Sequence, residues 1–437
     1  MNLEKLFSRA KEKGITDIEI FSSDRTSLNI DIFNGTVDKY EIAATEALTI
    51  KGIYNNKMGR FSTEVLSDDV IEEILDTIIA SAKEIDSLDD AIIYEGDESY
   101  KDLSDIYNDE LYNLDVQKKI DYLLKLDDYL HKYDNRVKVV ETMYSEDTAA
   151  VLLKNSKGIN LTNKANAAFI GGSVIVKDEV DQRVGFDVVI SNDFNDFNIE
   201  TLAKDIVEDA LASLGAKPVP SDSYEIVYSN GAIATLLSAF QGIFSADSVQ
   251  KGLSLLKGKL EEKIGSDLVT ITDDPFMKKS AASRSFDDEG VATSYKELVS
   301  KDVLKTFLHN LVTAKKDGVK STGNGFGGGV DSVNLKLEAG SSNLEEMIKS
   351  CKKGIFITNV QGAHSGVNAV SGDFSLQASG YYIENGEKIR PVALITVAGN
   401  FLEMLKDITM VGNDLKMSYY GVTSPSIKVK SMQVSGS

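Results

Sequence analysis

The residues whose types could do chemistry are concentrated between Gly362 and Glu387, where the sequence reads GAHSGVNAVSGDFSLQASGYYIENGE. Its glycines permit positive φ angles and a close backbone approach, and its Asn and Asp side chains stabilise tight turns. An imidazole, a hydroxyl and a carboxylate follow one another closely at His364, Ser365 and Asp373. Such a loop is typical of a binding or catalytic site, although a hairpin connection without chemistry explains the same residues equally well.

The three histidines of the chain do not indicate a metal site. None of His131, His309 and His364 has a second His or a Glu three or four residues away, the spacing that would hold zinc from one helix face. We expect His131 in the last turn of a helix, where a cation complements the helix dipole. We expect His309, which lies in an apolar run, to be partly buried with its hydrogen bonds satisfied. His364 is a lone imidazole.

Signatures of a nucleophilic enzyme are also missing. The sequence has no G-x-S-x-G elbow, and the neighbouring side chains of His364 and Ser365 cannot act as base and nucleophile without an unusual backbone. Cys351, the single cysteine, has lysines but no histidine nearby in sequence, so we predict that it is not catalytic. A single cysteine also excludes an intramolecular disulfide and a cysteine-cluster metal site.

A glycine-rich segment at 323–329, GNGFGGG, resembles a phosphate-binding loop at first sight. It lacks the Lys and the Ser or Thr of a P-loop. The residues that follow it, VDSVNLKLE, are strand-like, whereas a nucleotide loop would lead into a helix. We therefore expect a turn-rich loop near a cleft. Nothing in these residues, taken by themselves, predicts an independent enzyme.

The elements that position these residues begin with an internal duplication. In the first unit we expect helix 2–13, strands 17–23, 26–33, 36–53 and 59–64, and helix 68–85. In the second we expect helix 115–132, strands 137–145, 148–154, 159–177 and 183–191, and helix 199–214. Hairpin turns are indicated at Asn34-Gly35 and at residues 155–158. We therefore predict two α-ββββ-α units, at residues 1–95 and 115–216.

An acidic connector at 96–114 separates the two units. It belongs to a longer stretch, 86–114, that mixes acids with tyrosines. A solvated connector is favoured over one in which Tyr94, Tyr100 and Tyr107 lay the segment on a neighbouring surface. A second boundary follows helix 199–214, because two of the five prolines lie in the segment AKPVPSD.

Residues 222–437 are predicted to form a β-rich C-terminal domain. Strands are expected at 224–228, 268–272, 291–299, 302–307, 334–338, 354–360, 374–384, 391–399 and 426–434. Helices are expected at 232–244 and 342–352. The fold class is therefore α+β, with mainly antiparallel pairing in this last domain.

Composition and charge exclude several classes of partner. The 437 residues carry 47 Lys and Arg against 68 Asp and Glu, a net charge of −21. Nucleic-acid binding and docking on anionic lipid both need basic surface, so neither is expected. Residues 1–14 form an amphipathic helix and not a secretion signal, and no run approaches 18 apolar residues. We expect a cytoplasmic protein.

At this point the sequence resembles a known family. The Gly362–Glu387 block, the following Arg390-Pro391-Val392 and the segment ITMVGNDL at Ile408–Leu415 are similar to the TldD/PmbA family, and the resemblance covers essentially the whole chain. These proteins were long described as candidate modulators of DNA gyrase. The resemblance implies a subunit of a cytoplasmic metallopeptidase.

The family has two branches, which differ in the metal site. The TldD branch carries a His-Glu-x-x-x-His motif on a helix of the last domain and a cysteine near the C-terminus, which together hold zinc. The matching positions here are Ser238, Ala239 and Ile243, and the C-terminal GVTSPSIKVKSMQVSG has no cysteine. The chain therefore resembles the PmbA branch, also called TldE, whose members lack the zinc site.

That resemblance implies a partner role. The chain would pair with a TldD-like subunit that holds the zinc, with no cofactor of its own, and the complex would cleave unfolded or extended peptides. A homodimer can form where no such subunit is present. Two alternatives remain: a stand-alone binding or regulatory protein, such as a gyrase modulator, and a self-sufficient hydrolase with an unrecognised site. Residues expected to line the peptide passage, unless they only fix the turn, are Asn359, Gln361, His364, Ser365, Asn368 and Asp373.

Overall fold

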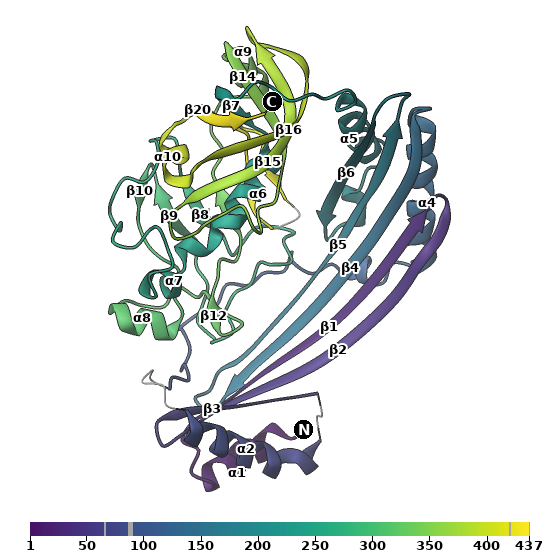
Figure 1. The fold of residues 1–437 in the computed structure, drawn as a ribbon. Helices are drawn as coiled ribbons and strands as arrows, with labels where there is room; N and C mark the ends of the chain where they lie inside the picture. Colours follow the sequence, from purple (N-terminus) through teal and green to yellow (C-terminus); the bar gives the residue numbers. More distant parts are fainter. Residues whose placement is uncertain (65–66, 86–90, 419–420, 437) are drawn as a thin grey trace.

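The computed structural model describes residues 1–64, 67–85, 91–418 and 421–436. Two groups of helices and strands share one N-terminal sheet, and a β-rich domain follows them (Figure 1). The predicted α+β class and the β-rich C-terminal domain are confirmed. Within the described ranges, every helix is too short or too polar to span a lipid bilayer.

The two N-terminal groups repeat one order of elements, apart from a short additional helix, α3, at the start of the second. The first contains α1 (Leu3–Glu12), β1 (Ile18–Phe33), β2 (Thr36–Tyr54), β3 (Lys57–Thr63), a 3-10 turn (Asp68–Val70) and α2 (Ile71–Glu84). The second contains α3 (Asp109–Tyr112), α4 (Val116–Tyr133), β4 (Val137–Asn155), β5 (Asn160–Lys177), β6 (Gln182–Ser191), a 3-10 turn (Phe194–Asp196) and α5 (Ile199–Ala212).

The duplication is present, but within the described ranges each unit has three strands where the sequence predicted four. The expected breaks fall at polar residues, near Asp24 in the first unit and Glu146 in the second. Both lie inside continuous strands because β1 and β4 pair with each other across them, with Asp24 opposite Ala150 and Leu28 opposite Glu146. Pairing on both sides keeps a polar stretch extended.

All six N-terminal strands form one antiparallel sheet in the order β3-β2-β1-β4-β5-β6. The β1–β4 pairing joins the two units and runs from Glu19 opposite Asn155 to Phe33 opposite Glu141. The predicted hairpin between β1 and β2 is confirmed, and Asn34 and Gly35 both have positive φ, at 44° and 79°. That geometry belongs to a tight two-residue turn, for which Asn-Gly is well suited.

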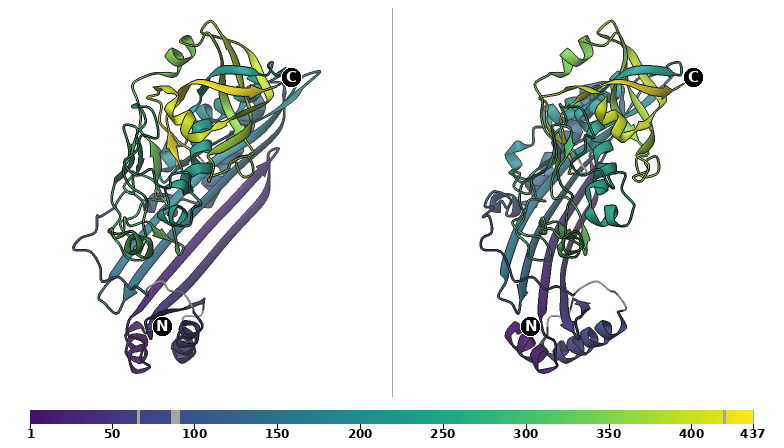
Figure 2. Two further views of the ribbon diagram at one scale, coloured as in Figure 1. Left: turned by 60° about the vertical axis from the view of Figure 1, so that its left-hand side comes forward. Right: turned by 90° about the vertical axis from the view of Figure 1, so that its left-hand side faces the viewer.

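Helices cover only the two ends of one sheet face. Because side chains alternate along a strand, the even-numbered Ile18, Ile20, Leu28, Ile30 and Ile32 of β1 share that face. The first two pack with α1 and α2, and the last three pack with α4 and α5. Figure 2 shows α1 and α2 at one end of the sheet, away from the C-terminal strands.

The outer half of β2 is exposed. Every residue from Thr36 to Ala47 is exposed to solvent. In the part of the chain that the structure describes, this stretch pairs only with β1, since β3 begins its pairing at Leu48. Val37, Tyr40 and Ile42 are 42%, 50% and 58% exposed. We call Thr36–Ala47 the open edge.

The C-terminal domain is built from two six-stranded sheets and short helices. Its helices are α6 (Asn230–Phe240), followed by a 3-10 turn (Gln241–Phe244), α7 (Ala246–Gln250), α8 (Leu311–Asp317), α9 (Leu344–Lys349) and α10 (Phe401–Lys406). One sheet contains β16 (Glu387–Asn400), β15 (Asp373–Glu384), β14 (Lys353–Gln361), β7 (Asp222–Tyr228), β20 (Ile427–Ser435) and β17 (Ile408–Val411), in that order. The other contains β10 (Val303–Leu304), β9 (Lys296–Ser300), β8 (Ile271–Asp273), β13 (Leu335–Leu337), β19 (Thr423–Ser424) and β18 (Lys416–Met417). A separate small hairpin pairs β11 (Gly325–Phe326) with β12 (Gly329–Val330).

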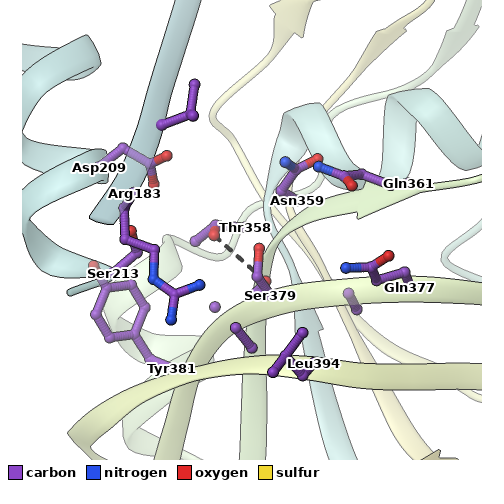
Figure 3. A pocket seen from close by; sticks show the side chains of 14 residues that line it. Arg183, Asp209, Ser213, Thr358, Asn359, Gln361, Gln377, Ser379, Tyr381 and Leu394 are labelled. Carbon is purple, nitrogen blue, oxygen red and sulfur yellow. Dashed lines mark hydrogen bonds between the residues drawn. The ribbon is translucent and has the colours of Figure 1, made fainter. Parts of the chain in front are cut away.

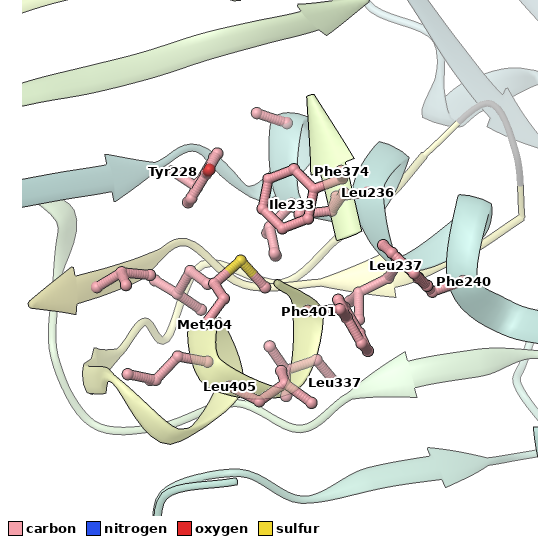
Figure 4. Close-up of a cluster of buried hydrophobic side chains, with 14 of the residues drawn as sticks. Tyr228, Ile233, Leu236, Leu237, Phe240, Leu337, Phe374, Phe401, Met404 and Leu405 are labelled. Atoms are coloured by element: carbon pink, nitrogen blue, oxygen red, sulfur yellow. The ribbon is translucent and has the colours of Figure 1, made fainter. Parts of the chain in front are cut away.

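Antiparallel pairing dominates this domain, as predicted, with β7–β14 and β13–β19 as parallel exceptions. The strands expected at 268–272, 291–299 and 302–307 are shorter and displaced, because most of 251–295 follows irregular paths. The core lies between the two sheets around α6, where Phe240 stacks on Phe401 with ring centroids 4.3 Å apart (Figure 4). Such stacking adds to the stability gained by burying both rings.

The connector does not behave as the sequence predicted. Residues 86–90 lie outside the described residues, but Tyr94 and Tyr100 pack on a small core that contains Ile159 and Phe286. The Tyr100 hydroxyl donates to the Gly290 carbonyl at 2.8 Å. The segment is therefore laid against both the N-terminal sheet and the C-terminal domain, and the solvated interpretation is wrong.

Two isoleucines that differ in burial provide a stability test of this sheet. Ile30→Ala removes a fully buried side chain beneath α4 and α5, so we expect the free energy of unfolding to fall by about 2–5 kcal/mol. Ile42→Ala, on the open edge, should change it by about 0.5 kcal/mol or less. Urea unfolding of the isolated chain measures both, and equal losses would contradict the assignment of the two environments.

Candidate functional site

Strand β14 separates two pockets of the C-terminal domain. Near its end, Val360 faces α6, whereas Asn359 and Gln361 line a pocket against the second N-terminal unit. The residues that the sequence assigned to one peptide passage are therefore divided between two places.

The first, which we call the α6 pocket, has a volume of about 440 Å³. It is lined by Thr235, Ser238, Ala239, Val360, Gly362, Ala363, His364, Val367 and Ala369. Ser238 and Ala239, two of the three positions that the sequence analysis matched to the metal motif, therefore share this pocket with the one histidine of the glycine-rich block. Helix α6 is held at its start by Ser229, whose side chain accepts a hydrogen bond from the Ala232 amide at 3.2 Å.

Ile243, the third motif position, does not line this pocket. Helix α6 ends at Phe240, and Ile243 lies on the following 3-10 turn with 1% of its surface exposed, inside the main core. Its side chain contributes to packing and is not available as part of a site.

The remaining predicted residues stabilise the loop. The Asn368 side-chain oxygen accepts from the amides of Val370 and Ser371 at 2.9 and 3.1 Å. Asp373 accepts from the Asn400 side chain at 3.0 Å, and this bond is the main reason that the pKa of Asp373 is lowered. Ser365 donates to the Gly362 carbonyl. These contacts match the alternative in which such residues only fix the turn.

The loop itself is shorter than the sequence block indicated. Only residues 362–372 connect strands, because β15 begins at Asp373 and pairs with β14 and β16.

The second pocket, which we call the polar slot, has a volume of about 210 Å³. Figure 3 shows Arg183 and Asp209 on one side and Asn359, Gln361 and Gln377 on the other. Thr358, Ser379, Tyr381, Ala393 and Leu394 complete the wall formed by β14, β15 and β16. Desolvation raises the pKa of Asp209, and the charge of Asp187 adds to the shift. Sequence reasoning missed Arg183, Asp209 and Gln377, because no local pattern places β6 and α5 opposite β15.

The α6 pocket does not fit a zinc ion. Protein zinc sites use three or four ligands from Cys, His, Asp and Glu. This pocket offers one imidazole, two hydroxyl groups and no carboxylate or thiolate. In the described ranges, no group of three or more such residues could hold a metal ion.

The other histidines and the cysteine have structural surroundings. His131 lies in the last turn of α4, as predicted, with Nδ1 3.1 Å from the Asp127 carbonyl oxygen. His309 is 4% exposed and its Nδ1 has no hydrogen-bond partner, so the expectation of a satisfied ring is wrong; burial lowers its pKa and keeps it neutral. Burial raises the pKa of Cys351, which makes a reactive thiolate unfavourable despite the nearby lysines.

The glycine-rich segment forms a turn, as predicted. It makes the β11–β12 hairpin, and the Gly325 amide donates to Asp287 at 2.8 Å. Burial, helped by the charge of Glu289, raises the pKa of Asp287 to about 7. The hairpin is thus anchored by a carboxylate, which leaves no role for it as a phosphate loop.

Comparison with known proteins agrees with this architecture. Three family models match the chain in order: PmbA/TldA metallopeptidase domain 1 at residues 18–84, the central domain at 109–214 and the C-terminal domain at 221–436. The chain belongs to the PmbA/TldD family. The metalloprotease PmbA of Escherichia coli O157:H7 is 25% identical over 99% of this chain and 96% of its own length. Matches of this extent to PmbA proteins place the chain in the PmbA branch.

Two further relatives show the breadth of the family. A metalloprotease TldD homologue of Buchnera aphidicola subsp. Schizaphis graminum is 29% identical over 73% of this chain and 72% of its own length. The crystal structure of a candidate modulator of a DNA gyrase from Thermotoga maritima is 35% identical, covers 99% of both chains and has a TM-score of 0.93. The PmbA/TldD fold described above is therefore shared over the full chain.

Two substitutions separate the motif positions by their environment. Ser238→His should leave the free energy of unfolding within about 0.5 kcal/mol, because the side chain faces open space in the α6 pocket. Ile243→His should lower it by about 2 kcal/mol or more, because it places a polar ring in the core. Urea unfolding measures both, and equal effects would contradict the burial of Ile243.

Proposed function

We propose that this chain is the non-catalytic subunit of a TldD-type zinc metallopeptidase complex that cleaves unfolded or extended peptides. The observation that supports the proposal is the α6 pocket, where Ser238 and Ala239, two positions that the sequence resemblance matches to the family's metal motif, carry no metal-binding side chain. The zinc of the complex then belongs to the TldD-like subunit.

The side chains at these positions explain why the chain would not act alone. A metallopeptidase needs ligands that leave an open coordination position, and a carboxylate that takes a proton from the bound water. The Ala239 methyl group cannot accept a proton, and a Ser238 hydroxyl is a poor substitute for an imidazole. His364 supplies one nitrogen from the opposite side of the pocket.

The open edge supports a partner role. An exposed strand edge with apolar side chains is prone to pair with another strand, and soluble proteins usually protect it. Val37, Tyr40 and Ile42 follow the buried row of β1, with Tyr40 opposite Ile30 and Ile42 opposite Leu28. We assign this surface to the TldD-like subunit, because the proposed activity is complete only when that subunit is present.

A stand-alone gyrase modulator is the alternative raised by the name of the Thermotoga maritima relative. The net charge of −21 disfavours direct contact with DNA, so this role would depend on protein contacts alone. No feature of the described residues favours it.

Metal content and reconstitution test the proposal together. The purified chain should contain far less than one zinc per molecule by elemental mass spectrometry. Mixed with a TldD-like subunit that has an intact His-Glu-x-x-x-His motif, it should form a heteromer on size-exclusion chromatography and restore cleavage of an unfolded peptide.

Matched variants sharpen this test. Replacing the motif Glu of the TldD-like subunit by Gln should abolish cleavage, whereas Ser238→Ala in this chain should leave it unchanged. One zinc per molecule in this chain alone, or full activity of the TldD-like subunit without it, would contradict the proposal.

The open edge gives a second test of pairing. Ile42→Lys should weaken the heteromer about tenfold or more, since a buried isoleucine contributes roughly 1.5–3 kcal/mol. Val180→Lys is the control, because Val180 is also exposed and apolar but lies in the turn between β5 and β6. Sedimentation velocity measures both affinities. If Ile42→Lys binds the TldD-like subunit with wild-type affinity, or if the chain pairs only with itself, the open edge is not part of the interface with that subunit.

A further inference from the structure

The polar slot lies where three neighbouring strands lose their regular register. Thr358 is an extra residue of β14, because Ile357 pairs with Gly380 and Asn359 with Ser379. On the other side of β15, Ala378 pairs with Ile395 and Gly380 with Val392, so Ser379 faces two residues of β16, Ala393 and Leu394. Bulges of this kind re-aim side chains and are over-represented next to functional sites.

Leu394 shows the same disturbance in its backbone. It has a φ of 57°, which is unfavourable because its Cβ crowds the backbone, and 67% of its surface is exposed. Leucine in the left-handed region costs free energy and persists only where the surroundings impose it. An exposed apolar side chain in a strained position fits a contact with a ligand better than it fits a role in packing.

The slot also holds polar groups without protein partners. The side chains of Asn359, Gln361 and Gln377 are exposed on adjacent strands β14 and β15 and, within the described ranges, make no hydrogen bond to another residue, so a ligand there would replace water. Gln361 and Gln377 are direct cross-strand neighbours. A carboxamide offers both a donor and an acceptor, which is also what each peptide group of an extended chain offers.

The opposite wall carries one charge of each sign. Arg183 donates through Nε to Asp181 at 2.9 Å and also approaches the Ala216 carbonyl, and it lines the slot together with Asp209. Because the charge of Arg183 is already paired with Asp181, the slot is not arranged for an anionic ligand. Its volume of about 210 Å³ corresponds to roughly seven waters, enough for one or two small residues.

We propose that the polar slot binds the main chain of an extended peptide, with the carboxamides of Asn359, Gln361 and Gln377 pairing with its amide groups. Leu394 and Ala393 then contact a side chain, and binding depends little on peptide sequence. This proposal rests on the proposed function, because it places a substrate-binding site on the subunit without zinc. β14 forms one wall of the slot and one wall of the α6 pocket, so a peptide in the slot would lie across this strand from Ser238 and Ala239.

Fluorescence anisotropy of the full chain with a fluorescein-labelled, unstructured peptide of Gly, Ser and Ala tests the binding. Gln377→Leu and Asn359→Leu should each weaken binding about five- to tenfold, as expected for the loss of a hydrogen bond. Gln117→Leu is the matched control, because Gln117 is an exposed glutamine on α4, outside the slot. Thermal unfolding of each variant verifies that the fold is intact.

A peptide in which ester linkages replace alternate amides separates main-chain recognition from general adhesion. It should bind the wild-type chain several-fold more weakly than the amide peptide, and the difference should shrink in Gln377→Leu. No binding by the wild-type chain, equal binding by the slot variants, or equal binding of the two peptides would overturn the proposal.

The same variants distinguish this proposal from the proposed function. If the slot variants bind peptide as tightly as the wild-type chain and also form the heteromer, the proposed peptide binding in the slot is contradicted and the partner role is not. A chain that binds peptide through the slot but never pairs with a TldD-like subunit would overturn the partner role and leave the slot standing.

Discussion

The pairing of β1 with β4 is the interaction on which the rest of the structure depends. It turns two repeated units into one continuous sheet, from Glu19 opposite Asn155 to Phe33 opposite Glu141. Because strand side chains alternate, this single register sets one face of the sheet under both pairs of helices and turns the other toward the C-terminal domain. Phe21 and Leu153, on that other face, share a small core with Phe286. The connector aromatics complete the same core, so the sheet, the connector and the last domain are held together at one place.

The two pockets along β14 show how one fold can keep its architecture while the side chains that line its pockets differ. Helix α6 is packed through Ile233, Leu236, Leu237 and Phe240, and these residues would be needed whether or not a metal were bound (Figure 4). Ser238 is partly buried on the side of the same helix that faces the α6 pocket, where it can vary without disturbing the core. A member of the PmbA branch can therefore retain the family's architecture with different side chains at the motif.

Much of the fold was predictable from local signals, and most of what was missed depends on distant contacts. The Asn34-Gly35 hairpin, the helix stripes and the strands β14 to β16 follow from short-range patterns. The continuity of β1 through Asp24 does not, because it is imposed by pairing with β4, more than a hundred residues away. The site was predicted in part for the same reason. The sequence singled out His364 and Ser238, which share the α6 pocket. Alternation along β14 places Asn359 and Gln361 in the polar slot instead, together with Arg183 from the second N-terminal unit.

The open edge has a consequence for how the protein is produced. Backbone groups on an exposed strand do not distinguish a companion subunit from another copy of the same chain, and successive additions to such edges need not close into a finite assembly. If the proposed TldD-like subunit covers this edge, any surplus of this chain over that subunit would therefore be at risk of precipitation. Solubility then becomes a property of the ratio between two polypeptides, and matched rates of synthesis would protect this sheet as effectively as a change in its sequence.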